Sequence, residues 1–478
     1  MGRYSVKYFL SIDCGLTKSK AVLFERTGKM LFESQLATPR KSNQINTAAL
    51  HKTVVTLIND ILKSTGIDPE DILTVSTSGH GNGIYFIGEN GILPFGFSSM
   101  YTESKKYTPP TDATFPITLQ SSWSGQPLAI LSHIKHEKPE LFAKIRKILF
   151  CKDLIKYILT ERICTDYTDA SAAGLLNCKT AQYDEKLLKI YDLDGHADIL
   201  PDLCRCTDTI GTVSEKFAKV SGLSVKTQVV GGLFDVNSCM LGAGITSPGK
   251  YCIIAGTWGI NSAIVEAPIS CKEITQCCNF SYPEEYMCID SAPTSCTNLE
   301  WFTKNILRDI SYRQADEIVE HQQGDPTLLY LPYIFTPMDI NISGSFVGLK
   351  AEHTYKDMLR AVFEGIVFDH AYRLEKLKRA GIVYDSAVLT GGAANSSVFC
   401  HMFADCTGLE IYTTTQSQTG ALGGAIIGSV AAGLYKDVAE AANAMVQVQR
   451  CYKPKTTDYY RQKFELFKET VNKLRNIQ

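Results

Sequence analysis

The sequence lacks the features that would tie the protein to a membrane or a nucleic acid. No apolar run reaches the length of a membrane span, and the N-terminal stretch MGRYSVKYFL contains no apolar segment typical of an export signal. The 48 lysines and arginines nearly balance 50 aspartates and glutamates, so the net charge of −2 offers no excess of cations to a phosphate backbone. We therefore expect a cytoplasmic protein with no membrane or nucleic-acid partner.

The sequence also lacks the paired cysteine spacing of zinc sites and a Walker A phosphate-binding loop. Its 16 cysteines are scattered singly or as Cys204-Arg-Cys206 and Cys277-Cys278. In a reducing cytosol such cysteines are expected to be free thiols, most of them buried. With 45% hydrophobic and 21% charged residues the composition is that of a globular protein, and 478 residues suffice for two or more domains.

One acidic residue stands where an apolar strand should turn into a helix. Val229 and Val230 end at a double glycine, Asp235 follows three residues later, and apolar side chains then recur at helical spacing. Ligands of open α/β sheets bind at such strand ends, which favours a catalytic or binding role for Asp235. The alternative is a helix cap, because aspartate is a favoured N-cap residue.

Two Gly/Thr turns point to phosphate binding. The strand-like run 251–255 ends in Gly256-Thr257-Trp258-Gly259, where backbone N–H groups and a hydroxyl can bind an anion. A similar run ends in Asp13, whose carboxylate suits a hydrated Mg²⁺. In the turn that follows Asp13, four residues could contact an anion: Gly15, Thr17, Lys18 and Lys20. Taken alone, this second segment would be a plain β-hairpin with polar turn residues.

The two segments resemble each other. Residues 12–24 (IDCGLTKSKAVLF) and 254–266 (IAGTWGINSAIVE) each show a strand, a Gly/Thr turn and a second strand. Similarity at half the chain length predicts two related domains that face one another and hold a triphosphate between their hairpins. A carboxylate base about twenty residues from a phosphate turn then favours phosphoryl transfer onto a hydroxyl.

Three further loops carry candidate binding residues. His80 and Asn82 follow a predicted strand in a glycine-rich loop, where a hydroxyl-binding role for Asn82 is favoured over catalysis by His80. Trp123 and Gln126 suit a sugar, because aromatic rings stack on its CH face while amides bind its hydroxyls, although Trp123 could also be core. A strand, a double glycine and a helix start form a nucleotide-binding turn at Gly391, Gly392 and Asn395.

Apolar periodicity predicts the main elements. We expect strands within 8–36, a helix over 47–64, a strand over 72–75, helical structure over 128–160 and a polar turn over 163–178 that carries Asp166, Asp169 and Ser171. Farther along we expect a strand over 328–333, helices over 355–380 and 457–476, a strand over 387–389, and a small-residue helix from Thr419 that can pack closely on a neighbour.

Taken in order, four motifs resemble those of the FGGY carbohydrate kinases. They are Asp13-x-Gly15-x-Thr17, Gly232-Leu-Phe-Asp235, Gly256-Thr257-Trp258 and Thr390-Gly391-Gly392-Ala393. The resemblance covers nearly the whole chain. Within the family it is most similar to the L-xylulose kinase branch, on SGHGNGIYF, SSWSGQPL, VVGGLFDV, GTWGINS and APTSCTNLEWF.

The resemblance implies an actin-like, ribonuclease-H-like α/β fold with two domains and a deep cleft. The implied domains are 1–245, for the sugar and the first phosphate turn, and 246–478, for the nucleotide, with the last helix packing back between the lobes. It also implies ATP, Mg²⁺ and a ketose or polyol with a terminal hydroxyl, with homodimers common. By resemblance Asp235 is the base and a metal contact, Asp13 a metal contact through water, and Asn395 part of the adenosine turn.

Two departures from the family lie on the sugar side. Gly81-Asn82 stands where xylulose kinases usually carry Met-His, and no Asp occurs at Ser98-Ser99-Met100-Tyr101, where many members have one. The phosphoryl-transfer residues are in place. The chain is therefore expected to phosphorylate an L-xylulose-like sugar, and the alternative is a regulatory pseudo-kinase that binds ATP and sugar without turnover.

Overall fold

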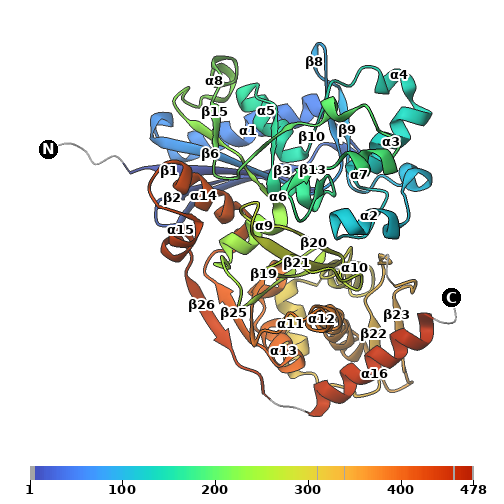
Figure 1. The fold of residues 1–478 in the computed structure, drawn as a ribbon. Coiled ribbons are helices and arrows are strands. Elements are labelled where there is room, and N and C mark those ends of the chain that lie inside the picture. Colours follow the sequence, from blue (N-terminus) through green and yellow to red (C-terminus); the bar gives the residue numbers. More distant parts are fainter. Residues whose placement is uncertain (1–5, 309, 338–339, 456–457, 476–478) are drawn as a thin grey trace.

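The computed structural model describes residues 6–308, 310–337, 340–455 and 458–475. It forms two lobes, each built on a seven-stranded mixed sheet covered by helices (Figure 1). The sheet of the first lobe has the order β15-β16-β6-β1-β2-β3, with β17 paired to β6, and that of the second has the order β20-β21-β19-β18-β24-β25-β26.

The strands of these two sheets are short to medium in length. In the first sheet they are β1 (Tyr8–Cys14), β2 (Lys18–Glu25), β3 (Met30–Ala37), β6 (Ile72–Gly79), β15 (Thr209–Thr212), β16 (Gln228–Val230) and β17 (Leu233–Phe234). In the second they are β18 (Tyr251–Ala255), β19 (Gly259–Val265), β20 (Gln276–Asn279), β21 (Tyr286–Ala292), β24 (Ser386–Thr390), β25 (Glu410–Thr414) and β26 (Val448–Tyr452).

Smaller sheets of two or three strands lie outside the two main sheets. They are β4 (Arg40–Lys41), β5 (Gln44–Asn46), β7 (Tyr85–Gly88), β8 (Gly91–Ile92), β9 (Phe95–Phe97), β10 (Lys147–Leu149), β11 (Cys164–Asp166), β12 (Leu176–Asn177), β13 (Gln182–Tyr183), β14 (Asp202–Cys204), β22 (Leu329–Leu331) and β23 (Ser345–Val347).

Helices cover both faces of the sheets. The first lobe has α1 (Thr47–Thr65), α2 (Thr111–Thr118), α3 (Pro127–Glu137), α4 (Pro139–Phe142), α5 (Cys151–Thr160), α6 (Tyr167–Ala172), α7 (Glu185–Ile190), α8 (Glu215–Ser221) and α9 (Asp235–Gly242). Later in the chain come α10 (Thr297–Asn305), α11 (Tyr312–His321), α12 (Tyr355–Arg379), α13 (Ser397–Thr407), α14 (Thr419–Ala431), α15 (Val438–Met445) and α16 (Asp458–Arg475).

The two sheets repeat one pairing scheme. β1, β2 and β3 form an antiparallel meander, and β1 also pairs in parallel with β6. In the same way β18, β19 and β21 are antiparallel neighbours, with β20 added outside β21, and β18 pairs in parallel with β24. Both sheets continue through one more parallel strand to an antiparallel edge, β15 or β26. The internal similarity of 12–24 and 254–266 therefore corresponds to two equivalent hairpins.

Helix α14 joins the lobes. Although it belongs to the second half of the chain, it packs on α9 and on strands β1 and β6 of the first sheet (Figure 1). Its glycines make this possible, since an added Cβ at Gly424 would lie 2.3 Å from Ser11 Oγ. The small-residue helix that the sequence predicts from Thr419 is confirmed, including its close packing on a neighbour.

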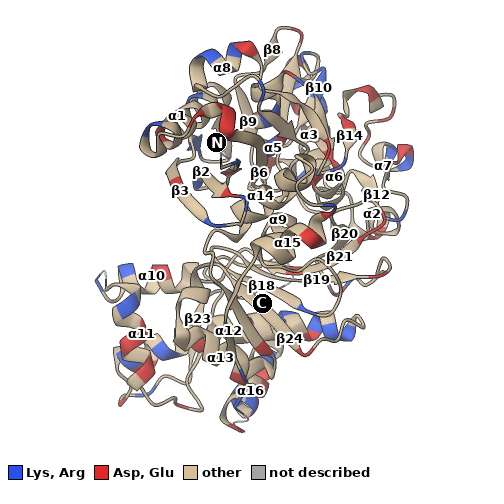
Figure 2. Cartoon of the chain, turned by 90° about the vertical axis from the view of Figure 1, so that its left-hand side faces the viewer, with Lys and Arg blue, Asp and Glu red and all other residues tan. Residues whose placement is uncertain are grey.

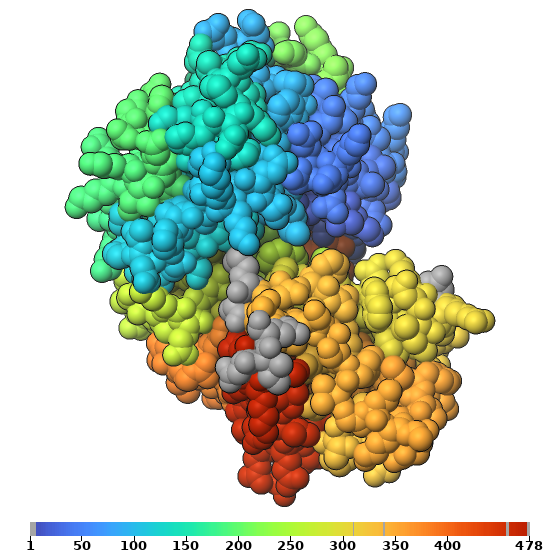
Figure 3. Space-filling model, turned by 90° about the vertical axis from the view of Figure 1, so that its right-hand side faces the viewer, coloured from blue at the N-terminus to red at the C-terminus, as the bar shows by residue number. Residues whose placement is uncertain are grey.

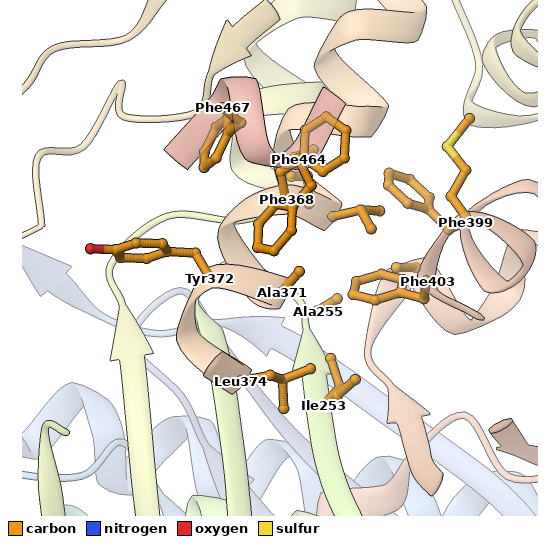
Figure 4. Packing of buried hydrophobic residues seen from close by; sticks show 14 of the residues in the cluster. Ile253, Ala255, Phe368, Ala371, Tyr372, Leu374, Phe399, Phe403, Phe464 and Phe467 are labelled. Carbon is orange, nitrogen blue, oxygen red and sulfur yellow. The ribbon is translucent and has the colours of Figure 1, made fainter. Parts of the chain in front are cut away.

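The core of the second lobe surrounds α12. Its buried stripe includes Phe368, whose ring centroid lies 5.9 Å from that of Phe464 and 5.6 Å from that of Phe467 on α16 (Figure 4). Phe399 and Phe403 of α13 pack nearby in the same core. The terminal helix α16 thus contacts α12, α13 and β22 within the second lobe, whereas α14 is the helix that packs on the opposite sheet.

Most predicted elements are confirmed, and two expectations are corrected. Residues 128–160 are not continuously helical, because Lys147–Leu149 forms β10 and pairs with β7. The expected polar turn at 163–178 instead contains β11, α6 and β12. Of the predicted terminal helix 457–476, residues 457 and 476 lie outside the described part of the chain, and α16 occupies 458–475.

The surface agrees with the near-neutral composition. Acidic and basic residues are interspersed along the elements seen in Figure 2. In the space-filling view, the surface is indented between the blue part of the first lobe and the yellow and orange part of the second lobe (Figure 3). Among the described helices, none combines the length and hydropathy needed to cross a bilayer. All 16 cysteines are free, and most are buried, as expected.

Candidate active site

The turn between β1 and β2 is held by hydrogen bonds and leaves its polar donors exposed. Gly15 N–H donates to the Lys18 carbonyl (2.9 Å), and the Thr38 hydroxyl donates to the Gly15 carbonyl (2.7 Å). The side chains of Thr17 and Lys18 are exposed beside this turn. A fixed turn with free N–H and hydroxyl donors is suited to an anion.

Asp13 and Lys20 face each other across the same hairpin. They are register partners, and Lys20 Nζ lies 3.6 Å from Asp13 Oδ2. Lys20 Nζ also donates to Gln418 Oε1 (2.7 Å), the residue just before α14. The hairpin therefore presents Lys20 and Asp13 side by side, both partly exposed, and contacts the segment that crosses from the second lobe.

The sheet brings Asp235 to the strand edge that carries Asp13. On β6, Ser78 is the register partner of Asp13 on one side and of Leu233 on the other. Asp235 is the first residue of α9, and its Oδ1 accepts the Val236 N–H (2.8 Å). The N-cap of α9 is Phe234, which makes no side-chain bond. This arrangement disfavours the capping interpretation.

The environment of Asp235 changes its acidity. Burial raises the pKa of Asp235 to about 7, and the negative charge of Asp13 adds to the rise. Backbone hydrogen bonds from Val236 and Gly81 oppose it. A carboxyl group with a pKa near neutrality has the proton affinity of a general base.

The second Gly/Thr turn joins β18 to β19. Gly256 N–H donates to the Trp258 carbonyl (3.2 Å), Cys296 N–H donates to the Gly256 carbonyl (2.9 Å), and the Thr257 side chain is exposed. The nucleotide-type turn follows β24 next to it. Gly391 has φ +83°, and a Cβ there would lie 2.6 Å from the Ala255 carbonyl oxygen. The parallel pair β18–β24 thus places both turns at one sheet edge.

The remaining residues of the nucleotide-type turn are open to a ligand. Gly392 begins a short 3₁₀ turn that ends at Asn395, and both residues are exposed. An added Cβ at Gly392 would meet no atom within 4 Å, so the space beside it is open. Gly391, Gly392 and Asn395 therefore lie together with Gly256 and Thr257 in the second lobe, while Asp13, Lys20 and Asp235 gather in the first.

The loop after β6 contains polar atoms without protein partners. His80 Nε2 lies 2.9 Å from the Tyr85 hydroxyl, while the Asn82 Oδ1 and Ser78 Oγ atoms are buried and make no hydrogen bond. Burial lowers the pKa of His80 to about 4, and the positive charge of Arg40 adds to the fall, so His80 is neutral at pH 7. Buried polar groups normally have partners, and a bound hydroxyl compound would supply them here.

The same loop explains one departure from the family pattern. A Cβ added at Gly81 would lie 2.1 Å from a ring carbon of Phe234, the residue that precedes Asp235. Asn82 adopts φ +58°, a left-handed conformation that asparagine tolerates better than most residues. In this packing Gly81 cannot be replaced by a larger residue such as Met without a shift of Phe234.

Trp123 and Gln126 occupy one tightly packed loop. Gln126 Oε1 accepts the Trp123 N–H (3.1 Å), and Gln126 Nε2 donates to Gln120 Oε1 (3.1 Å). A Cβ added at Gly125 would lie 1.9 Å from the Ser99 carbonyl oxygen, so this loop presses on the Ser98–Ser99 segment. Both ends of the Gln126 amide have protein partners, and a sugar contact from either residue stays a prediction.

Sequence reasoning missed two buried lysines near the site. Lys152 and Lys156 of α5 are fully buried, and Lys156 Nζ donates to the carbonyl of Gly231, in the turn before Asp235 (2.8 Å). Their signal in the sequence is their placement, with Asp153, in the largely apolar stretch CKDLIKYIL. Lysine in a helix is usually solvated, so the pattern alone does not distinguish them.

The site fits a metal that arrives with a nucleotide. Across the described residues, no three His, Cys, Asp or Glu side chains are grouped so that they could hold a metal ion. Mg²⁺ bound to nucleotide phosphates needs only one or two carboxylates and otherwise keeps water. Asp13 and Asp235 supply two carboxylates. They lie close enough for the charge of Asp13 to raise the pKa of Asp235.

Comparison with known proteins covers nearly the whole chain. The model of the FGGY family of carbohydrate kinases matches with its N-terminal domain over residues 8–242 and its C-terminal domain over 252–432. The "Probable L-xylulose kinase" of Pasteurella multocida is 27% identical, covering 98% of this chain and 99% of its own. The "L-xylulose/3-keto-L-gulonate kinase" of Escherichia coli is 27% identical over 98% of each chain.

Solved structures share the two-lobed arrangement. The gluconate kinase from Lactobacillus acidophilus gives a TM-score of 0.89 at 23% identity, over 98% of this chain and 99% of that one. A ligand-bound xylulose kinase from the same organism gives 0.88 at 23% identity over 98% of each chain. These likenesses confirm the expected two-domain α/β fold.

Proposed function

The chain belongs to the FGGY family of carbohydrate kinases, and from that premise we propose that it transfers the γ-phosphoryl group of ATP to a terminal hydroxyl of an L-xylulose-like ketose. Asp235 is the general base. The observation that carries this assignment is the place of Asp235 at the start of α9, beside Asp13, with a pKa raised to about 7.

Asp235 takes the proton of the sugar hydroxyl as its oxygen attacks the γ-phosphorus. A base with a pKa near the working pH is ionised in a large fraction of molecules and still has useful proton affinity. Phosphoryl transfer otherwise depends on positioning and on stabilising phosphate charge. The exposed donors of both Gly/Thr turns suit the second task.

Nucleotide binding is divided between the lobes. We assign the phosphates to Gly15, Thr17, Lys18 and Lys20 of the first turn and to Gly256 and Thr257 of the second. We assign adenosine to Gly391, Gly392 and Asn395, where the space beside Gly392 is open. Mg²⁺ bound with ATP would be held by Asp13 through water and by Asp235, and it would neutralise part of the phosphate charge.

The sugar pocket is assigned to the loop after β6 and the Trp123 loop. Ser78 Oγ and Asn82 Oδ1 lack protein partners and would bind sugar hydroxyls, beside a neutral His80. Trp123 would stack on the sugar and Gln126 would bind or orient it. An L-xylulose-like sugar is favoured because the relatives at 27% identity are named for L-xylulose. No observation favours the pseudo-kinase alternative.

We also propose the cytoplasm as the compartment and a homodimer as the assembly. Sixteen free thiols are compatible with a reducing compartment, where disulfides do not form readily. The dimer rests on resemblance to the family alone. Light scattering of the purified protein, which would give about twice the chain mass of 52.8 kDa, tests it.

The activity should depend on pH with a midpoint near neutrality. Since only the carboxylate of Asp235 accepts a proton, and its pKa is raised to about 7, kcat/KM should rise with pH through that value. Below pH 6 it should fall roughly tenfold per pH unit, the slope for one essential ionisation. Initial rates from pH 5.5 to 9 measure this, and a profile that is flat between pH 5.5 and 7 would contradict the assignment.

A substrate panel tests the proposed activity. ADP release with ATP and Mg²⁺ should be stimulated strongly by L-xylulose and weakly or not at all by D-xylulose, L-ribulose, 3-keto-L-gulonate, gluconate and glycerol. Strong stimulation by a sugar acid alone would overturn the preference for a neutral ketose. ATP hydrolysis that no sugar stimulates would contradict the kinase activity itself.

A further inference from the structure

A buried charged cluster lies beneath the turn that carries Asp235. Lys152 and Lys156 are each 0% exposed. Lys152 Nζ lies 2.5 Å from Asp153 Oδ1 and 2.8 Å from Asp166 Oδ1, and Lys156 Nζ lies 3.0 Å from Asp153 Oδ1. Ammonium groups are tolerated at such depth only when carboxylates and hydrogen bonds replace water. The cluster is therefore a fixed part of the interior.

The carboxylates of the cluster stabilise the positive charge of its lysines. Although burial opposes a charged amine, Asp153, Asp166 and Asp169 raise the pKa of Lys152 well above its usual value. Lys152 therefore stays an ammonium ion throughout the working pH range. Its partner Asp166 belongs to β11 and caps α6, because it accepts the Thr168 N–H (2.8 Å). The start of α6 is thus fixed to α5.

Two connections lead from this cluster to the catalytic turn. Lys156 Nζ donates to the Gly231 carbonyl (2.8 Å) at the beginning of the turn. At its end, the Phe234 N–H donates to Thr168 Oγ1 (2.9 Å), and the Thr168 hydroxyl donates to Asp166 Oδ2 (2.5 Å). Thr168 uses its hydroxyl both ways, as donor and as acceptor. Phe234 is the residue directly before Asp235.

The turn itself has little freedom to adjust. Gly232 adopts φ +84°, and a Cβ there would lie 2.6 Å from the Thr77 carbonyl oxygen. A Cβ at Gly231 would lie 2.1 Å from the Arg205 carbonyl oxygen. The backbone thus passes between close neighbours, and the Phe234 N–H bond fixes the residue directly before Asp235, together with the pairing of Phe234 with Gly79 on β6. A base displaced by about 1 Å can lose roughly 10²-fold in rate.

We propose that Thr168 is a positioning residue for Asp235, and that its hydroxyl transmits the rigidity of the buried Lys152–Asp166 pair to the Phe234 backbone. The inference rests on the proposed function for its kinetic consequence and on the hydrogen bonds alone for its structural one. Thr168 itself touches neither sugar nor nucleotide in this account.

The kinetic test compares three threonine substitutions. Thr168→Val keeps the shape and removes the hydroxyl, and it should lower kcat roughly 10- to 100-fold. The KM for ATP should stay within about twofold, because Thr168 is not among the residues assigned to the nucleotide. Thr168→Ser should recover most of the activity. Thr118→Val is the matched control, since that buried hydroxyl donates to the Thr114 carbonyl of its own helix (3.2 Å).

Hydrogen exchange tests the same bond without any substrate. Mass spectrometry of peptides that cover 231–236 should show loss of protection in Thr168→Val and wild-type protection in Thr168→Ser and Thr118→Val. This readout separates the inference from the proposed function. A wild-type protein with no sugar-dependent ADP release would contradict the function, while the exchange result would still decide the role of the Thr168 hydroxyl.

Two results would overturn the proposal. One is a Thr168→Val protein with wild-type kcat and wild-type exchange over 231–236. The other is a loss of kcat that matches a loss of folded protein in thermal unfolding, with the serine variant equally affected. If the valine variant does not fold, Thr168→Ala takes its place, and wild-type kcat in that smaller variant would overturn the proposal equally.

Discussion

Replacing Asp235 by asparagine should lower kcat by roughly 10²–10⁴-fold, the usual effect of losing a general base. Asparagine keeps the shape of the side chain and an oxygen that can accept the Val236 N–H, now bonded at 2.8 Å. It cannot take up the proton of the sugar hydroxyl. The measurement is ADP release at saturating ATP and sugar, with variant and wild type assayed side by side.

Asp194→Asn is the matched control for this substitution. It makes the same chemical change at an exposed aspartate of the first lobe, and its kcat should equal that of the wild type. An Asp235→Asn enzyme within threefold of wild-type kcat would remove Asp235 from the role of base.

Gly423→Ala should destabilise the protein by about 3 kcal/mol, the upper part of the range for overpacking. In an ordinary helix the change from Gly to Ala is stabilising by roughly 0.5–1 kcal/mol. Here the added Cβ would lie 2.0 Å from the Ser238 carbonyl oxygen and 2.7 Å from its carbon, both backbone atoms of α9. One helix must move, because α14 packs directly on α9 and both close neighbours are backbone atoms. Thermal unfolding measures the loss.

The same helix offers the control. A Cβ at Gly420 would have only Cys239 Sγ as a close neighbour, at 3.4 Å, which is an ordinary contact distance. Gly420→Ala should therefore leave the unfolding midpoint unchanged or raise it slightly. Equal midpoints for Gly420→Ala and Gly423→Ala would show that α9 and α14 do not pack as tightly as described.

The fold was predictable where the pattern is local. The strands of the β1–β2–β3 meander follow from short apolar runs, α1 from one buried apolar face, and α12 from apolar residues at helical spacing, although α12 is buried on most sides along its middle. Similarity between 12–24 and 254–266 also gave the two equivalent hairpins. β10 was not predictable, since three residues become a strand only through pairing with β7, about sixty positions away.

The candidate site was predictable where residues end strands. Asp13 and Asp235 follow apolar runs, and parallel pairing with β6 places such ends at one edge. The role of Thr168 was hidden, because it depends on a hydrogen bond to a backbone N–H 66 positions away. The same holds for Gly423, whose contact with Ser238 joins helices from opposite halves of the chain.

The central claim is that Asp235 directs phosphoryl transfer from ATP to a sugar, and product identification tests it most directly. Wild-type protein is incubated with L-xylulose, ATP and Mg²⁺, and the products are followed by phosphorus NMR. We expect a sugar phosphate monoester that appears in equal amount with ADP and that forms at least about 10²-fold more slowly with Asp235→Asn. ADP accompanied only by inorganic phosphate, or ester formation by Asp235→Asn at the wild-type rate, would contradict the account.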